Sequence, residues 1–173
     1  TASTHSELLF FTDKGKVYQI KMYDIPEGRR ATRGKSVMNF ISLGAEEKIT
    51  SILPVPKDTK GKEGLSLMLV TKNGVGKRVA AKNFSDVRAS GIIAIRLDSD
   101  DSLVSASIVD RGDTIAVVSA KGQAIRFKES DVREMGRSAG GVRVMKLTKG
   151  DNIVGAQTVH KAEGDKPLLL VVS

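Results

Sequence analysis

The chain contains one sequence pattern three times, and this repetition limits the folds available to it. An apolar run, a short polar turn ending in glycine and a second strand-like run occur as F-F-T-D-K-G-K-V-Y-Q-I at 10–20, L-V-T-K-N-G-V-G-K-R-V at 69–79 and V-V-S-A-K-G-Q-A-I-R-F at 117–127. The last residues, L-V-V-S at 170–173, match the start of the pattern once more. A repeat of about 50 residues is typical of solenoids, propellers and arrays, in which each repeat is one supersecondary unit.

Each unit is predicted to hold four short strands. The first strand is an apolar run such as 8–12. A tight hairpin turn follows, in which a glycine can adopt a positive φ; these glycines are Gly15, Gly74 and Gly122. The second strands are predicted at 16–22, 75–79 and 123–127, each followed by a loop rich in Gly, Arg and Ser. The third strands end at Leu43, Leu97 and Leu147, and the fourth strands begin six residues later.

These strands predict an all-β fold. Val and Ile dominate the apolar runs, and no segment of about 12 residues holds a helical period. Four short strands in a unit of about 50 residues are typical of a propeller blade. A sandwich or an isolated barrel would also be all-β, but the fixed register of the repeat argues against both. Three blades cannot close a ring, because propellers use about four to eight, so we expect the chain to be part of a longer protein.

We predict one repeat domain over residues 1–173. Its units span 8–64, 65–113 and 114–167, and the opening strand of a fourth unit spans 168–173. The first unit is longer because of the polar stretch K-D-T-K-G-K-E-G at 57–64, which has no apolar periodicity and is predicted to be a loop insertion.

Composition narrows the class of protein. With 173 residues and 40% hydrophobic content, the chain can bury a substantial core. It has no cysteine, which excludes a disulfide scaffold and favours a reducing compartment. No apolar run approaches about 18 residues, and the first residues do not resemble a signal peptide, so we expect a cytoplasmic location and no membrane partner.

Basic residues are concentrated in the loop after the second strand of every unit. The net charge is +8, which favours polyanionic partners, although a basic surface of solvated lysines would have the same sum. Equivalent loops of successive blades lie on the same part of a propeller, so we expect one positive stripe. Arginine matches phosphate geometry, and glycines let backbone amides approach a phosphate. The predicted DNA-binding loop residues are Arg29, Arg30, Arg33, Lys35, Lys82, Arg88, Arg133, Arg137 and Arg143. Those predicted in second strands are Lys77, Arg78 and Arg126.

Some of these arginines are instead expected to pair with nearby acids, namely Glu27, Asp86 or Asp131. Aromatic residues make up only 4% of the chain, which disfavours single-stranded ligands that need stacking platforms. No helix suited to a major groove is visible. Contact with the phosphates of duplex DNA, with little direct base recognition, is the remaining interpretation.

The sequence offers no catalytic constellation. His5 and His160 are isolated, so no metal site is predicted. The acidic D-S-D-D at 98–101 is predicted to be a turn between strands. The G-K within 73–78 lacks the spacing of a phosphate-binding loop. Tyr18 and Tyr23 have no carboxylate cluster beside them in sequence, so a packing role is expected rather than a nucleophilic one.

Several segments resemble one known family. The string G-K-V-Y-Q-I-K-M-Y-D-I-P-E-G-R-R-A-T-R-G at 15–34, followed by E-K-I-T-S-I-L-P-V at 47–55, closely resembles the C-terminal domain of DNA gyrase A subunits. So do I-R-F-K-E-S-D-V-R-E-M-G-R at 125–137 and G-V-R-V-M-K-L at 141–147. The resemblance covers essentially the whole chain from residue 8.

The resemblance implies a six-bladed β-pinwheel, a propeller whose blades exchange strands, of which this chain would supply three to three and a half blades. It implies binding and wrapping of double-stranded DNA around a basic rim. The resemblance implies that this wrapping supports ATP-dependent negative supercoiling by a bacterial holoenzyme. That holoenzyme is a type II topoisomerase, and it also contains the remainder of the gyrase A polypeptide and the gyrase B polypeptide. No cofactor is implied for this segment.

Two departures from the family pattern matter. The family's box, Q-R-R-G-G-K-G or close to it, is absent, and R-A-T-R-G-K at 30–35 looks like a degenerate copy in the equivalent position. The cleavage domain with its tyrosine nucleophile is also absent, so the chain is expected to be a binding module and not an enzyme by itself. The alternatives are the paralogous chain of topoisomerase IV, or a propeller that binds an acidic protein partner.

Overall fold

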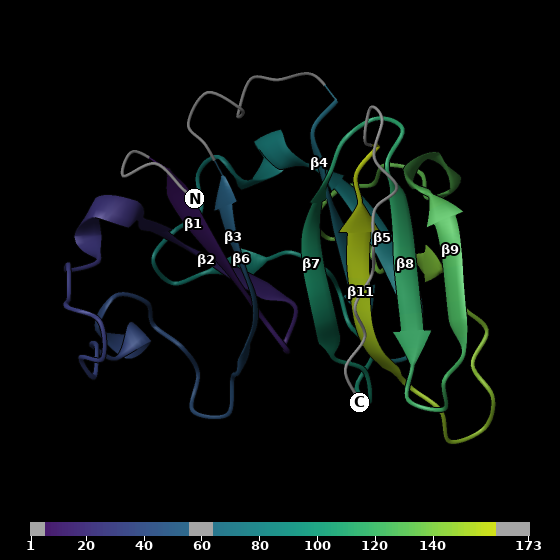
Figure 1. The fold of residues 1–173 in the computed structure, drawn as a ribbon, viewed down its shortest axis with the longest axis horizontal. Coiled ribbons are helices and arrows are strands. Elements are labelled where there is room, and N and C mark those ends of the chain that lie inside the picture. Colours follow the sequence, from purple (N-terminus) through teal and green to yellow (C-terminus); the bar gives the residue numbers. More distant parts are fainter. Residues whose placement is uncertain (1–5, 56–63, 162–173) are drawn as a thin grey trace.

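The computed structural model of the protein describes residues 6–55 and 64–161 (Figure 1). In these residues, eleven strands form three antiparallel sheets: β1 (Glu7–Thr12), β2 (Lys16–Lys21), β3 (Ile49–Val55), β4 (Ser66–Thr71), β5 (Val75–Ala80), β6 (Ile92–Ile93), β7 (Leu103–Val109), β8 (Thr114–Ser119), β9 (Ala124–Lys128), β10 (Val142–Arg143) and β11 (Ile153–Val159). Short 3-10 turns are η1 (Met22–Asp24), η2 (Val37–Asn39), η4 (Ala81–Phe84) and η5 (Glu129–Asp131). His5 and the predicted segments at 57–63 and 168–173 lie outside the described residues.

The repeated motif forms a β-hairpin in every unit, as predicted. The hairpins are β1–β2, β4–β5 and β8–β9, and their turns place Gly15, Gly74 and Gly122 at φ values of 72°, 81° and 78°. Figure 1 shows β8 running toward its turn at one end of the molecule and β9 returning from it. A positive φ is readily adopted only by glycine, which explains why glycine occurs at the same place in each copy.

The outer strands are exchanged between units. The first sheet has the order β3-β1-β2-β6, and the second has the order β10-β5-β4-β7. Thus β6 pairs with β2 of the preceding unit, with Val17 opposite Ile92, and β10 pairs with β5 in the same way. The four strands of one unit therefore do not all lie in one sheet. The short third strand instead covers the open backbone edge of the preceding hairpin, which agrees with the strand exchange that the family resemblance implies.

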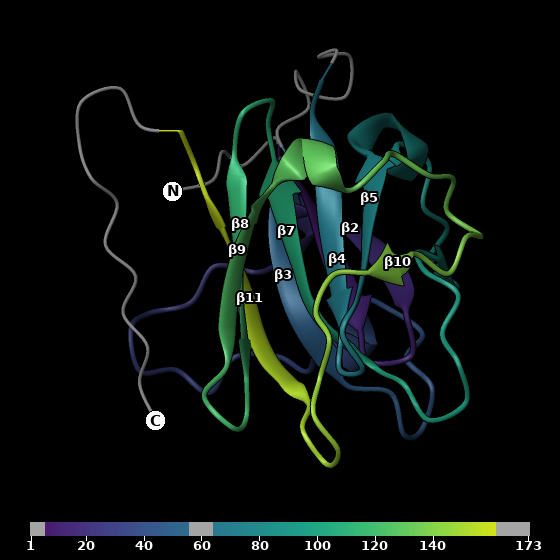
Figure 2. The same cartoon turned by 90° about the vertical axis from the view of Figure 1, so that its right-hand side faces the viewer.

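The predicted third strand of the first unit also differs. The segment before Leu43 forms the 3-10 turn η2, with Ser36 capping it by accepting a hydrogen bond from the Met38 amide at 3.3 Å. The third sheet has the order β11-β8-β9 within the described residues. Figure 2 shows this sheet in front and the first sheet behind it.

Hydroxyl groups join the innermost strands of the three sheets. The hydroxyl of Ser51 on β3 accepts from the amide of Ala106 on β7 at 3.0 Å. Ser105 on β7 donates to the carbonyl of Ala156 on β11 at 2.8 Å. Short polar side chains suit this position because the inner strands approach one another without sharing a backbone ladder.

Apolar side chains on both faces of each hairpin form the cores between the blades. On β4, Leu67 and Leu69 pack in one cluster with Phe11 of the first blade. The alternate residues Met68 and Val70 pack in a second cluster, against the third blade. All six residues of β4 are buried. Burial of both faces explains why the first strand of the unit is a continuous apolar run and does not alternate with polar residues. No helix of the described residues is long and apolar enough to span a membrane.

Candidate nucleic-acid interface

The long loops after β2, β5 and β9 begin in the same way in every unit. Each second strand runs into a 3-10 turn, η1, η4 or η5, whose first backbone amide bonds back to the start of the hairpin. In Figure 1 these turns appear in purple, teal and green, away from the end that carries the β8–β9 turn. The fold therefore places the predicted basic loops at equivalent positions in the three blades.

The loop of the first unit presents its cations in an exposed turn. The Thr32 amide donates to the carbonyl of Arg29 at 3.0 Å, and the Thr32 hydroxyl donates to the same carbonyl at 2.8 Å. Ala31 lies between them at φ 72°, in the left-handed region that alanine rarely adopts. This turn holds the backbone so that Arg29, Arg30 and Arg33 are all exposed.

The loop of the second unit is attached to the first blade. The side chain of Gln19 on β2 accepts a hydrogen bond from the Val87 amide at 3.2 Å. The amide of Gly91 donates to the carbonyl of Arg88 at 2.8 Å, and Gly91 has a φ of 75°. A Cβ at Gly91 would lie 2.6 Å from the ring of Tyr18, so glycine allows the loop to lie directly on that ring.

The loop of the third unit is attached to the second blade. The Met135 amide donates to the carbonyl of Arg78 at 2.8 Å, and the Ser66 hydroxyl donates to Glu134 at 3.1 Å. The guanidinium of Arg78 lies 3.5 Å from a carboxylate oxygen of Glu129 in η5. Each basic loop of the second and third units therefore lies across a seam between its own blade and the preceding one.

The structure places Lys77 in the interior, which is inconsistent with the prediction that it contacts DNA directly. Its side chain is 0% exposed, and its Nζ donates to the backbone carbonyls of Ala94, Arg137 and Ala139. Arg78 is half-buried beside Glu129. The paired acid is thus Glu129 and not one of the expected Glu27, Asp86 and Asp131. Lys77 lies at the same position of its unit as the buried Tyr18 does in the first unit. This equivalence was a signal of burial that the sequence analysis missed.

The remaining predicted cations are accessible. Arg137 is half-buried and donates to the carbonyl of Ile93 at 3.5 Å. The exposed residues are Arg29, Arg30, Arg33, Lys35, Lys82, Arg88, Arg126, Arg133 and Arg143. None of these exposed side chains forms an ion pair within the described ranges 6–55 and 64–161.

Acidic side chains cap the hairpin turns at the other end of the blades. Asp101 accepts from the Asn73 amide at 2.9 Å, and Asp151 accepts from the Lys121 amide at 3.0 Å. The hydroxyl of Ser119, and then the amides of Lys121 and Asn152, lower the pKa of Asp151. The D-S-D-D segment therefore forms a turn, as predicted. The described part of the chain contains no group of His and acidic residues suited to a metal ion.

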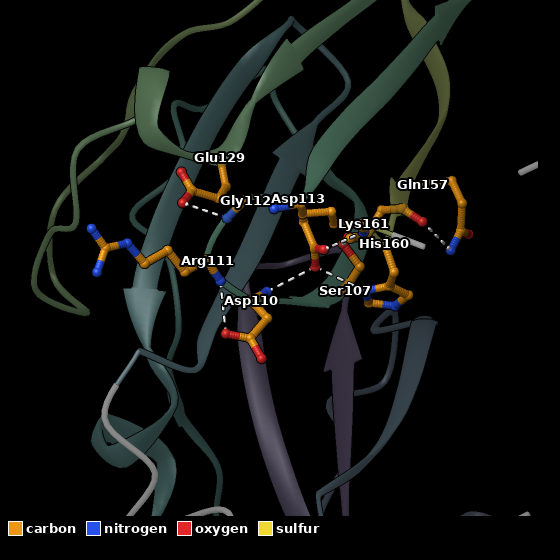
Figure 3. A network of polar contacts seen from close by, with 10 residues as sticks. Ser107, Asp110, Arg111, Gly112, Asp113, Glu129, Gln157, His160 and Lys161 are labelled. Carbon is orange, nitrogen blue, oxygen red and sulfur yellow. Dashed lines mark hydrogen bonds and ion pairs between the residues drawn. The ribbon is translucent and has the colours of Figure 1, made fainter. Parts of the chain in front are cut away.

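A second acidic network fixes the turn between β7 and β8 (Figure 3). Asp113 is buried and accepts from the amides of Asp110 and Lys161, both at 2.9 Å, and it lies 2.8 Å from His160 Nδ1. Burial raises the pKa of Asp113, but the two amides and His160 outweigh this effect and lower it overall. Glu129 accepts from the Gly112 amide at 3.1 Å, so the same turn is joined to η5. Asp113 and Glu129 therefore have structural partners within the described residues.

Comparison with known proteins identifies the family. A family model described as "DNA gyrase C-terminal domain, beta-propeller" matches residues 6–56, 65–110 and 113–160. The chain belongs to the DNA gyrase C-terminal domain family. Over 163 residues it is 39% identical to the DNA gyrase A protein of Klebsiella oxytoca, a match that covers 94% of this chain and 18% of the relative. The chain thus spans less than a fifth of the length of this gyrase relative.

Two solved structures have the same fold as this chain. A crystal structure of the C-terminal domain of DNA topoisomerase IV is 30% identical, with a TM-score of 0.81 over 91% of this chain and 48% of that chain. A structure of the DNA gyrase A C-terminal domain is also 30% identical, with a TM-score of 0.74 over 91% of this chain and 49% of that chain. The family membership and the four-stranded sheets confirm the predicted all-β propeller class.

Proposed function

We propose that this chain is a DNA-binding module that contacts the phosphates of duplex DNA through the basic loops of its three blades. The observation that carries the proposal is the set of exposed arginines and lysines at equivalent places in successive units, with no ion-pair partner among the described residues. Glycines in the same loops allow backbone amides to approach an anion. Membership of the gyrase C-terminal domain family supports this choice of ligand over an acidic protein surface.

The wider role follows from the relatives. We infer that the chain is part of a gyrase A polypeptide, with the remainder of that polypeptide and the gyrase B polypeptide as partners, and that it acts in the cytoplasm of a bacterium, near the nucleoid. Bending DNA along the basic loops would support ATP-dependent negative supercoiling by the holoenzyme. Bending a site of 20–30 base pairs costs on the order of 1–6 kcal/mol, so successive phosphate contacts must offset that cost. The chain would supply binding only, with cleavage and ATP hydrolysis carried out elsewhere in the holoenzyme.

Salt dependence tests this mode of binding. If about six phosphates are contacted, affinity for a labelled duplex should fall about a thousandfold between 50 and 200 mM salt. A flat salt response would contradict a phosphate-driven mode, and binding that requires an acidic protein instead of DNA would favour the adaptor alternative.

A pair of triple variants tests where the DNA lies. Replacing three loop cations by Gln should reduce the slope of log affinity against log salt by about 0.9 for each lost contact. The matched control removes the same charge at the hairpin ends of the blades and should retain the wild-type slope. The loop variant is R29Q/R30Q/R33Q and the control is K14Q/K72Q/K121Q. Equal losses in both variants would show that net charge, and not the position of the loops, governs binding.

A further inference from the structure

One buried ammonium group connects three segments near the seam between the second and third blades. Lys77 extends from β5, and its Nζ donates to the carbonyls of Ala94 and Ala139 at 2.9 Å each and to the carbonyl of Arg137. Ala94 directly follows β6 of the second unit, whereas Arg137 and Ala139 belong to the basic loop of the third unit. The Lys77 side chain is fully buried, so protein carbonyls replace its water shell.

The number of donors makes this contact sensitive to protonation. A protonated lysine has three N–H donors, and the three carbonyls use all of them. A neutral amine would have two N–H donors and one lone pair, so at least one carbonyl would lose its partner and face the lone pair. All three hydrogen bonds can therefore form at once only with the charged form of Lys77.

The segment held by Lys77 includes a predicted DNA contact. Arg137 contributes its carbonyl to Lys77, and its guanidinium reaches the carbonyl of Ile93 at 3.5 Å. An open hollow of about 620 Å³ lies between the two loops, lined by Gly91, Ile93, Gly136 and Arg137. The position of this guanidinium at the hollow thus depends on the backbone that Lys77 fixes.

We propose that Lys77 is a positioning residue that holds the basic loop of the third unit for phosphate contact, and that DNA binding at Arg137 is coupled to protonation of Lys77. This inference rests on the proposed function, because it assumes that a DNA phosphate reaches Arg137. It assigns Lys77 a role in binding although its side chain does not reach solvent.

Electrostatics supports the coupling. Burial, and then the nearby positive charge of Arg137, lower the pKa of Lys77 to about 8. A phosphate on Arg137 would offset that positive charge and favour the protonated lysine. DNA binding should then take up a proton near pH 8, and affinity should fall as the pH rises through this value.

Other charged groups surround the seam but have other roles or lie at its surface. Arg78 follows Lys77 on β5 and is directed to Glu129, and Glu134 bonds to Ser66. β4 carries no charged residue. The remaining charged residues at 81–96 and 129–143 are all exposed; they are Lys82, Asp86, Arg88, Arg96, Asp131, Arg133 and Arg143.

The test compares the full chain with Lys77→Met and with Lys72→Met. Both variants lose one lysine charge, but Lys72 is exposed beside the Gly74 turn, outside the proposed interface. Affinity for a labelled 30-base-pair duplex is measured by anisotropy at low salt between about pH 7 and 9.5. If the complex raises the pKa of Lys77 by about one unit, wild type and Lys72→Met should lose about five- to tenfold in affinity over this range.

Lys77→Met should bind more weakly at pH 7 and should lack this part of the pH dependence. Wild-type affinity with an unchanged pH profile in Lys77→Met would overturn the proposal. If this variant does not fold, the test is an NMR titration of the Lys77 side chain in the wild type and in Arg137→Gln. The pKa of Lys77 should rise when DNA is added to the wild type and should not rise when DNA is added to Arg137→Gln. An equal rise in both proteins, or no rise in either, would overturn it.

Failure of the proposed function has a separate signature. If the wild type binds no duplex at any pH, DNA is not the ligand and the coupling to DNA is excluded with it. The positioning of the loop is then judged from hydrogen exchange of the Arg96 amide, which bonds to Ala139. At pH 7, this amide should exchange faster in Lys77→Met than in wild type if Lys77 holds the loop, and equal rates would overturn that part as well.

Discussion

The first and second blades fill the same buried position with different chemistry. Tyr18 and Lys77 each lie three residues after the hairpin glycine, and both are fully buried. Tyr18 fills the space with an aromatic ring and donates its hydroxyl to Glu47 at 2.8 Å. Lys77 fills it with an ammonium group that donates to three backbone carbonyls. In these two blades, the position is therefore buried whatever the chemical type of its side chain, provided that the polar end of the side chain has partners.

This difference gives the two seams opposite responses to pH. Burial and the bond to Glu47 raise the pKa of Tyr18 to about 12, whereas burial and Arg137 lower the pKa of Lys77 to about 8. The stability contributed by Tyr18 is complete below its unfolded pKa of about 10 and is lost as the pH rises through about 12. Lys77 gives stability a pH dependence of the opposite sign, because burial disfavours its charged form. The free energy of unfolding therefore rises with pH as Lys77 loses its proton in the folded chain.

Truncating the aromatic side chain should have the largest effect on stability. Tyr18→Ala removes a buried ring and leaves a cavity beneath Gly91, so the free energy of unfolding should fall by about 3–5 kcal/mol. The control is Tyr23→Ala, where the side chain is 61% exposed, and it should change stability by less than about 0.5 kcal/mol. Urea unfolding of the two variants measures the difference. Similar losses in both would mean that the ring does not support the first seam.

Closing the space above that ring should have the next largest effect. Gly91→Ala places a Cβ 2.6 Å from Tyr18 and puts alanine at φ 75°. Left-handed backbone costs about 1–2 kcal/mol and overpacking about 1–3 kcal/mol, so a loss of at least about 2 kcal/mol is expected. Gly136→Ala is the matched control, because its Cβ would meet nothing within 4 Å. Combining Gly91→Ala with Tyr18→Leu should recover part of the loss, and no recovery would show that the ring is not the obstacle.

The titration of Lys77 should give a smaller, pH-dependent difference. Between about pH 8 and the ordinary lysine value of 10.5, the unfolded chain binds a proton that the folded chain has released. The free energy of unfolding should therefore rise with pH in this window for the wild type, relative to Lys77→Met. Above about pH 10, both proteins should lose stability as Tyr18 ionises only in the unfolded state. Chemical denaturation at several pH values measures the curves, and parallel curves between pH 8 and 10 would contradict the lowered pKa of Lys77.

The smallest effect is expected at the third copy of this position. Ile125 is 41% exposed, and a Cβ at Gly122 would meet nothing within 4 Å, whereas one at Gly74 would lie 2.7 Å from the Met145 carbonyl. Ile125→Thr should change the free energy of unfolding by no more than about 0.5 kcal/mol. Thermal unfolding of this chain measures the change, and a loss of about 2 kcal/mol would mean that this hairpin is covered as the other two are.

Hairpins were the most predictable part of the fold. The other turn residues vary between the copies, but glycine recurs because only glycine readily adopts the positive φ at Gly15, Gly74 and Gly122. The partner of the short third strand could not be predicted from the repeat. A two-residue strand such as Ile92–Ile93 carries too little side-chain pattern to distinguish its own hairpin from the preceding one. Only the backbone edge left open by β2 decides the pairing.

The candidate interface was predicted residue by residue with uneven success. Composition and position indicated the exposed loop cations, and the structure leaves them accessible. The expected exposure of Lys77 was wrong, because it was inferred from charge alone. The aligned residue of the first unit is Tyr18, which is buried, and this equivalence indicates a buried position for Lys77. The three carbonyl acceptors come from distant loops, so no local sequence signal could reveal them.

Strand exchange also determines the order in which the protein can fold as it leaves the ribosome. The edge of β2 is complete only when β6 arrives, after the whole β4–β5 hairpin has been synthesised. At about 5–20 residues per second, the nascent chain carries an unpaired strand edge for on the order of ten seconds. During that interval the edge can pair with the same segment of another nascent chain, since open edges template association. Slower translation between β2 and β6 would prolong the time for which this edge is unpaired.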